Sequence, residues 1–381
     1  MARALRLAAL IVAPIALAAA SLRHRYGGGY NFPDRSTPPR LSADDLDVVA
    51  ELEQPPGNIA VSAQGRVFLS LHPESWPSIN VAELVDGAVV PFPDYSFQRR
   101  GPDPDAFDNV LGIRIDRQNR LWALDNGTHG LRPGRVLAFD LDSRALVHEY
   151  TFPRSVVGLG SHLNDLQISH DGRHVIISDD GFFARKPALI VYDSVERHSR
   201  RLLDGHFSVV PEYYTPRVEG RKVEILGLIS VRPGVDSIAL DRAGEWLYFA
   251  PVTDRAMYRL RLSDLLDPEL TARELGSLVQ VYADKTMSDG ITTDDDGNIY
   301  ITDVEHSAVA RLGPDRRLET LVRDARLLRW PDGFSFGPDG WLYLTCSAIH
   351  LYMGRPPSTV SGHAPYHVVR FRPGPGAHPG H

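Results

Sequence analysis

The sequence DGITTDDDGNIYITD, residues 289–303, decides the fold because five related versions of it occur elsewhere in the chain. Each version has an apolar run, a turn that contains Gly or Asn, and a second apolar run. The others are NIAVSAQGRVFLS at 58–70, LGIRIDRQNRLWALD at 111–125, NDLQISHDGRHVIISD at 164–179, DSIALDRAGEWLYFA at 236–250 and DGFSFGPDGWLYLT at 332–345. Repeats of about 50 residues with several strands each are typical of radial architectures. The sequence therefore predicts an all-β chain that forms a six-bladed β-propeller.

The two ends of the propeller domain, residues 44–375, are predicted to pair with each other. Most repeats continue with a third and a fourth strand, but the sixth repeat stops after a third strand, YHVVRF at 366–371. The sequence DLDVVAEL at 45–52 is available to complete that last blade. Such pairing would close the ring and remove an exposed sheet edge.

The N-terminus is predicted to be a targeting segment rather than part of the propeller. Arg3 and Arg6 precede an apolar run at 7–20 that ends in three alanines, as in a secretory signal peptide. An uncleaved N-terminal anchor is the alternative for residues 1–20, because basic residues follow at 23–25. We expect an extracellular or periplasmic protein with a linker at 21–43 and a flexible tail at 376–381.

Composition excludes several classes of protein. The net charge of −7 argues against a nucleic-acid surface. A single cysteine, Cys346, excludes an intramolecular disulfide framework. The chain shows no nucleophile elbow, phosphate loop or dense Cys/His box, which argues against serine hydrolases, nucleotide enzymes and zinc sites. We expect a monomer that binds a small molecule and contacts a membrane only through an uncleaved N-terminal segment.

Polar residues recur where the inner strand of each repeat begins. Alignment of the repeats on their turns gives six equivalent positions, Gly57, Leu111, Asn164, Asp236, Asp289 and Asp332, with Asn58 and Asp165 adjacent. Carboxylates that converge on an axis repel one another unless a cation or hydrogen-bond donors balance them. Oxygen ligands of this kind suit Ca²⁺ or Mg²⁺. The alternative is that each Asp only caps the turn that enters its strand.

These positions yield specific assignments. The predicted ligands of a divalent cation are Asn164, Asp236 and Asp289. Asn58, Asp165, Asp236 and His306 are predicted to bind the small molecule. Asp332 and His162 are predicted to handle protons, since a loop histidine near neutrality can act as a general base, although a plain surface loop is the alternative. A long insertion at 205–234 is predicted to lie beside the channel mouth.

Several phrases resemble the Yellow and major royal jelly protein family, which includes bacterial members. They are LGIRIDRQNRLWALDNG, SHLNDLQIS, ALIVYD, LLDGHFSVVPE, SIALDRAGEWLYFAP and MSDGITTDDDGNIYITD. The resemblance implies a six-bladed, secreted propeller that binds an amine or takes part in dopachrome conversion. The chain is also distantly similar to gluconolactonase and regucalcin propellers, in which Asn164 and Asp289 match metal ligands. Gly57 and Asn58 stand where those propellers have a Glu.

Three functions remain open at this point. The first is an enzyme that hydrolyses a lactone or tautomerises a small cyclic metabolite at the channel mouth. The second is a non-catalytic binding protein for an amine or aromatic molecule, and the third is a scaffold for protein contacts. Propellers support all three functions, so the site has to decide between them.

Overall fold

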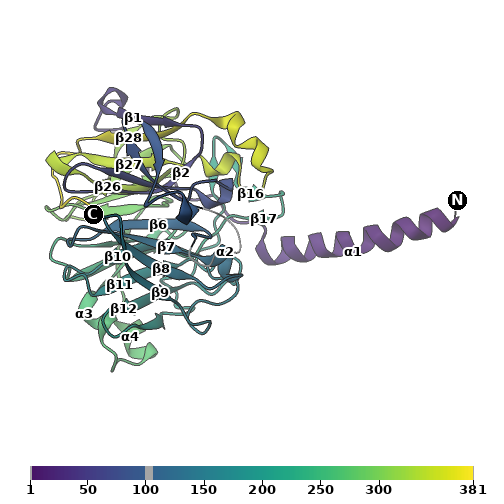
Figure 1. Cartoon of the computed structure of the whole chain (residues 1–381). Coiled ribbons are helices and arrows are strands. Elements are labelled where there is room, and N and C mark those ends of the chain that lie inside the picture. Colours follow the sequence, from purple (N-terminus) through teal and green to yellow (C-terminus); the bar gives the residue numbers. More distant parts are fainter. Residues whose placement is uncertain (1, 99–105, 381) are drawn as a thin grey trace.

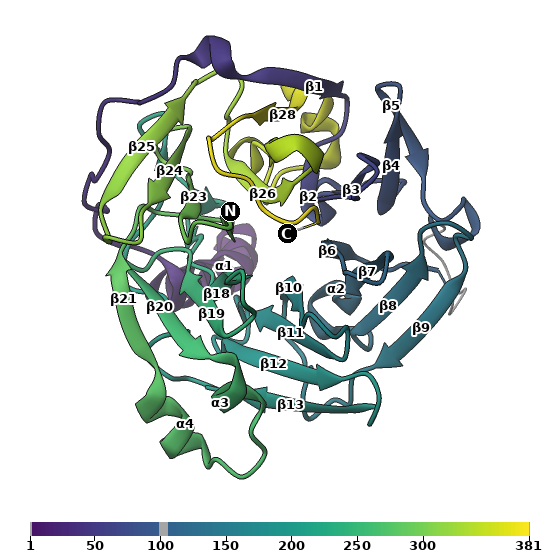
Figure 2. The ribbon, with the colours of Figure 1, turned by 90° about the vertical axis from the view of Figure 1, so that its left-hand side faces the viewer.

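The computed structural model describes residues 2–98 and 106–380, so Met1 and His381, the ends of the predicted targeting segment and tail, lie outside it. Six four-stranded antiparallel sheets surround a central channel, which confirms the six-bladed β-propeller (Figure 2). The inner strands are β2 (Pro56–Val61), β6 (Val110–Ile115), β10 (Leu163–Ile168), β18 (Val235–Leu240), β22 (Ile291–Thr293) and β26 (Pro331–Phe336). The second strands are β3 (Val67–Leu71), β7 (Arg120–Asp125), β11 (His174–Asp179), β19 (Trp246–Pro251), β23 (Ile299–Asp303) and β27 (Leu342–Cys346).

The outer half of each blade follows the repeat pattern. Third strands are β4 (Val81–Val85), β8 (Arg135–Asp140), β12 (Ala188–Asp193), β20 (Ala256–Arg261), β24 (Ala308–Leu312) and β28 (Tyr366–Phe371). Fourth strands are β5 (Ala88–Pro91), β9 (Leu146–Thr151), β13 (His198–Leu202), β21 (Gln280–Asp284), β25 (Leu318–Arg323) and β1 (Asp47–Leu52). Inner strands such as β2, β6 and β18 are buried along their whole length, whereas β9 has no fully buried residue. The core therefore lies between neighbouring blades and near the channel.

The ring closes as the sequence predicts. Strand β1 pairs antiparallel with β28, with Val48 opposite Val369 and Leu52 opposite Tyr366. The last sheet therefore has the order β1-β28-β27-β26 and joins the two ends of the propeller domain. This pairing gives β28 a partner on both sides, so its edge is covered.

Helix α1 (Ala2–Tyr26) projects from the face of the ring that carries α2 (Gly127–Gly130), β16 (Glu224–Ile225) and β17 (Ile229–Ser230) (Figure 1). It ends where Gly27–Gly29 begin, and Gly28 and Gly29 adopt positive φ angles of 72° and 146° that favour glycine. Among the described residues, no helix is both long enough and apolar enough to span a membrane.

The predicted linker runs along the edge of the propeller. The amides of Arg40 and Leu41 donate to the carbonyl of Leu321 (3.1 and 2.8 Å), and Arg35 forms an ion pair with Asp284. The predicted tail lies over the channel on the face opposite α1 (Figure 2). There the Gly380 amide donates to the Phe336 carbonyl (2.9 Å). Both segments are thus hydrogen-bonded to blades at these points.

The predicted insertion forms two short hairpins beside α1. They consist of β14 (Arg217–Val218) with β15 (Arg221–Lys222), and of β16 with β17. Two further short helices, α3 (Leu262–Leu266) and α4 (Ala272–Leu278), lie between β20 and β21 on the outer side of the fourth blade (Figure 2).

Candidate functional site

Most inner strands have a register irregularity close to their first residues. The interruption lies between Pro56 and Ile59 in β2, and it recurs at the equivalent place in β6, β10, β18 and β26. An irregularity of this kind inserts an unpaired residue and redirects its side chain. The polar positions Asn58, Asn164 and Asp236 fall within these interruptions, so their side chains face the channel instead of alternating across the blade.

Hydroxyl groups on the second strands hold the irregular segments in place. Ser70 Oγ accepts from the Asn58 amide (2.8 Å) and donates to the Leu111 carbonyl of the next blade (2.6 Å). Thr302 Oγ1 accepts from the amides of Asp289 and Gly290. Ser178 and Thr345 occupy equivalent positions and link their inner strands to neighbouring blades in the same way. These hydroxyls recur at one position of four repeats, a signal that the sequence analysis missed.

The acidic ring consists of Asn164, Asp236, Asp289 and Asp332, and it lies between two cavities. On the α1 side is the mouth, a cavity of about 70 Å³. On the inner side is the channel cavity, of about 10 Å³. All four ring residues line both cavities, as the repeat alignment predicted. The acidic ring is therefore the floor of the mouth.

The carboxylates of the acidic ring are held by neutral donors. Asn164 Nδ2 donates to Asp236 Oδ2 (2.7 Å), and Trp330 Nε1 donates to Asp289 Oδ2. Among the described residues, none of Asp236, Asp289 and Asp332 forms an ion pair. Burial and mutual repulsion raise the pKa values of Asp236 and Asp332 well above the usual range, and burial raises the pKa of Asp289 to about 6.

Asp165 and Asn58 differ from their predicted role, because they line the channel cavity but not the mouth. Asp165 accepts from Arg114 Nη2 (3.2 Å) and from Asn58 Nδ2 (3.1 Å), and all three residues are buried. Burial raises the pKa of Asp165 although the Arg114 guanidinium opposes this shift. The side chains of Asp165 and Asn58 are thus committed to an internal network beneath the floor.

His162 lines the mouth, but its charge differs from that of a general base. Its Nδ1 contacts Asp180 Oδ2 at 2.7 Å. Burial alone would lower the pKa of His162, but Asp180 and Glu74 outweigh it and raise this pKa to about 9. His162 is therefore an imidazolium near neutrality, which donates a proton rather than accepts one.

Further groups at the mouth come from segments that carry no repeat signal. The ring of His129 stacks on that of His162 with centroids 4.6 Å apart, and its Nε2 contacts Glu74 Oε1 at 3.2 Å. Burial lowers the pKa of His72 to about 4, so this imidazole is neutral. His129 has a left-handed φ of 53°, an uncommon conformation that is often found at functional sites.

Apolar residues form the walls of the mouth. They include Phe182, Phe183, Trp330, Ile349 and Met353, together with Ile225, Val231 and Pro233 of the insertion. The insertion therefore lies at the mouth, as predicted from its length. Apolar walls above an acidic floor suit a small organic molecule that carries a polar or positively charged group.

His306 is the one predicted site residue that lines neither cavity. Its Nδ1 contacts Asp303 Oδ1 (2.9 Å) and its Nε2 faces Asp34 Oδ1 (3.4 Å). Asp303 ends the second strand of its blade, so the turn that carries His306 lies farther from the axis than the inner strands. His306 thus joins the N-terminal segment to the fifth blade instead of contacting the mouth.

The donor chemistry of the acidic ring fits a divalent cation. Asn164, Asp236 and Asp289 offer carboxylate oxygens and an amide oxygen, the ligand atoms that Ca²⁺ and Mg²⁺ prefer. Burial, together with repulsion from neighbouring carboxylates, raises the pKa values of Asp236 and Asp289, and a bound cation would oppose both effects. In the part of the chain that the structure describes, however, no three His, Cys, Asp or Glu side chains are already arranged around a metal position. A cation would also replace the hydrogen bond between Asn164 and Asp236.

Solved structures with the same fold include enzymes and a calcium-binding protein. A gluconolactonase from Xanthomonas campestris has a TM-score of 0.56 and 13% identity, covering 90% of this chain and 98% of that chain. Regucalcin from Agrobacterium tumefaciens, described as a calcium-binding protein, has a TM-score of 0.50 and 15% identity, covering 85% and 93%. At such low identity, these similarities establish the propeller fold alone.

Curated relatives come from the honeybee, Apis mellifera. Major royal jelly protein 7 is 27% identical over 190 residues, which cover 47% of this chain and 40% of that protein. Major royal jelly protein 3 is 24% identical over 231 residues, which cover 58% and 40%. This chain thus spans about two fifths of the length of the relatives it matches. The model of the major royal jelly protein family matches residues 109–349, more than half of the sequence, and the chain therefore belongs to that family.

Proposed function

We propose that this protein acts on a small cyclic organic molecule at the mouth, with a divalent cation held at the acidic ring. The observation that carries this proposal is the convergence of Asp236, Asp289 and Asp332 beneath apolar walls with no ion pair among the described residues. A ligand or ion that supplies positive charge would relieve this repulsion. Lactone hydrolysis and tautomerisation are the reactions that fit best.

The residues that would hold Ca²⁺ or Mg²⁺ are Asn164, Asp236 and Asp289. When bound, such a cation polarises a carbonyl oxygen or lowers the pKa of water. Asp332, which is not one of these three ligands, is the carboxyl group that handles protons, and burial together with repulsion by Asp289 raises its pKa. The His162 imidazolium donates a proton to a developing oxyanion, and Asp180 holds its ring in position. Phe182, Phe183 and Trp330 exclude water around the bound ring.

Binding of an amine or aromatic molecule without turnover is the second candidate. The favouring observation is that aromatic side chains, Phe182, Phe183 and Trp330, line the same mouth as the three carboxylates of the acidic ring. An ammonium group is attracted both by carboxylates and by aromatic faces. This candidate needs neither a metal nor proton transfer.

The cellular location in this proposal is extracellular or periplasmic. Arg3, Arg6 and the apolar run at 7–20 support export, with the segment either cleaved or retained as an anchor. We further propose a monomer whose partner is the small molecule.

The test combines metal analysis of the purified protein with an activity screen on lactones and catechol derivatives. We expect bound Ca²⁺ or Mg²⁺ and turnover that Asp289→Asn abolishes. The matched control is Asp296→Asn, an exposed turn residue of the same blade. Tight amine binding without metal or turnover would favour the second candidate. Absence of both turnover and small-molecule binding would refute both functions.

A further inference from the structure

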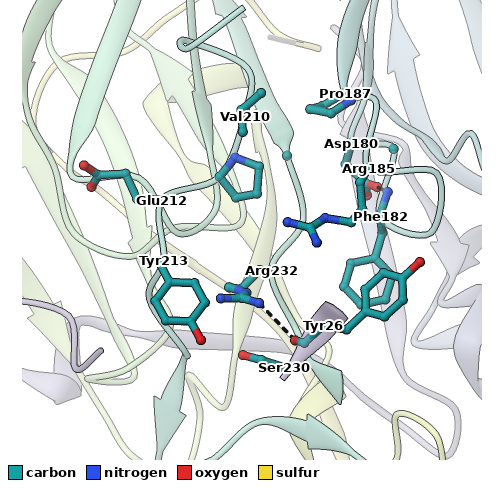
Figure 3. A pocket seen from close by; sticks show the side chains of 13 residues that line it. Tyr26, Asp180, Phe182, Arg185, Pro187, Val210, Glu212, Tyr213, Ser230 and Arg232 are labelled. Atoms are coloured by element: carbon teal, nitrogen blue, oxygen red, sulfur yellow. Dashed lines mark hydrogen bonds between the residues drawn. The ribbon is translucent and has the colours of Figure 1, made fainter. Parts of the chain in front are cut away.

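A second cavity lies beside the mouth, between the insertion, the turn after β11 and the end of α1. Its volume is about 120 Å³. Figure 3 shows Arg185 and Arg232 directed into it, with Tyr213 and Glu212 on one side and Phe182 and Tyr26 on the other. We call it the arginine cavity.

The two arginines carry positive charge that no carboxylate neutralises within the described residues. The acidic side chains that line the cavity, Asp180 and Glu212, are both engaged elsewhere. Asp180 pairs with His162 at 2.7 Å, and Glu212 pairs with Arg255 at 2.7 Å. Among the described residues, the groups that accept hydrogen bonds from Arg185 and Arg232 are neutral, namely backbone carbonyl groups at the end of α1 and the side chain of Tyr213.

The donors of Arg232 are only partly satisfied. Its Nη2 donates to the Tyr26 carbonyl (3.0 Å), whereas its Nη1 is buried without a hydrogen-bond partner. Burial lowers the pKa of Arg232, and the nearby Arg185 lowers it further. A buried donor without a partner is costly, and the exposed Arg185 also repels the charge of Arg232. An anion in the cavity would remove both costs.

We propose that the arginine cavity binds the carboxylate of a small organic acid. An oxyanion would accept from Arg232 Nη1 and from the free donors of Arg185, and guanidinium groups recognise oxyanions through strong, charge-assisted hydrogen bonds. Pro187, Val210 and Pro211 supply apolar lining, which suits an organic anion better than a fully hydrated inorganic one. Tyr213 supports the geometry, because its ring lies 4.4 Å from the Arg232 guanidinium carbon.

The position of the cavity narrows the class of substrate. Asp180 and Phe182 line both the arginine cavity and the mouth. The two cavities therefore adjoin, and in this proposal a molecule whose carboxylate lies between the arginines extends its other end toward the mouth. The substrate of the mouth is then a cyclic organic acid, a step that rests on the function proposed above.

The test compares phenylacetate, phenylacetamide and inorganic phosphate by isothermal titration calorimetry on the full chain. We expect phenylacetate to bind at least about tenfold more tightly than the uncharged amide. The Arg185→Gln/Arg232→Gln double variant should lose this preference. The control Arg221→Gln removes the same charge from an exposed site on the same insertion and should retain it. Equal binding of phenylacetate and phenylacetamide by the wild type would overturn the proposal.

Two further variants separate the possible causes of a loss. The double variant could lose binding through its lost contacts with the end of α1, since both arginines donate to that segment. Val210→Trp avoids this ambiguity, because it fills the cavity and leaves both arginines in place. It should weaken phenylacetate binding as much as the double variant does. Retained binding in Val210→Trp would place the anion elsewhere and overturn the proposal. If the wild type binds phosphate as tightly as phenylacetate and the double variant loses phosphate binding, the cavity is a general anion site. That result would overturn the assignment to an organic acid.

Phe183→Ala tests the link with the mouth, because Phe183 lines the mouth but not the arginine cavity. We expect this variant to weaken phenylacetate several-fold. Unchanged affinity would leave the carboxylate site in place and overturn its link to the mouth. Failure of the function proposed for the mouth would appear separately, as an absence of metal and turnover in a protein that still prefers phenylacetate.

Discussion

Replacement of Asp289 by asparagine should stabilise the metal-free protein at alkaline pH. Burial and neighbouring carboxylates raise the pKa of Asp289 from 3.8 to about 6. At ~1.36 kcal/mol per pKa unit, the charged form costs the folded state about 3 kcal/mol once the pH is well above 6. Asparagine carries no charge and still offers an oxygen to Trp330 Nε1, so this cost disappears.

The sign of the pH dependence follows from the raised pKa. Between about pH 4 and pH 6 the folded wild type binds more protons at Asp289 than the unfolded chain, so its stability falls as the pH rises. The variant lacks this component of the slope. The two proteins should therefore have similar stability below pH 4 and differ by about 3 kcal/mol at pH 8. For a chain of this length the unfolding entropy converts that difference to about 4 °C in Tm.

The assay is thermal unfolding from pH 4 to pH 8 in a chelator, with Asp296→Asn as the exposed control from the same blade. Addition of Ca²⁺ at 100 times its Kd should stabilise the wild type by about 2.7 kcal/mol and the variant much less. A variant that is less stable than the wild type at pH 8 without metal would refute the reasoning. So would a variant with an unchanged pH dependence, because Asp289 would then carry no electrostatic cost.

Three further predictions concern the channel, the mouth and the ring closure. Arg114→Leu should lower the unfolding free energy by about 3–5 kcal/mol, because it leaves buried Asp165 without the Arg114 guanidinium. In urea unfolding, the Arg114→Leu/Asp165→Leu double variant should recover part of this loss. An additive loss of stability in the double variant would contradict the pairing. Asp180→Asn should lower the pKa of His162 from about 9, because the charge that contributes most against burial is removed. A histidine NMR titration in which the pKa stays near 9 would exclude the assigned cause. Removal of residues 1–53 should expose the edge of β28 and promote aggregation, whereas removal of residues 1–26 should not. Size-exclusion chromatography distinguishes the two outcomes. A stable, monomeric protein of residues 54–381 would show that the closing strand is not required.

Contacts between different parts of the chain gave several site residues a role other than the one predicted from the sequence. The repeat alignment placed Asn58 and Asp165 next to the ring positions, where they were predicted to bind the ligand, but Arg114 of the second blade holds Asp165 beneath the floor. His162 was predicted as a base, and Asp180 and Glu74 make it an acid. His306 contacts Asp303 and the N-terminal segment instead of the ligand site.

The sequence by itself determined the features that depend on local periodicity: the six blades, the strand that closes the ring and the positions of Asn164, Asp236, Asp289 and Asp332. These follow from turn chemistry and strand length within each repeat, so every repeat reports them independently. Only the tertiary structure decided which groups meet at the mouth, because Glu74, His129 and Trp330 come from different blades and carry no repeat signal. The tertiary structure also decided the charge of each titratable group at the mouth. Burial and neighbouring charges set the pKa of such a group, and both are established only when the blades come together in the closed ring.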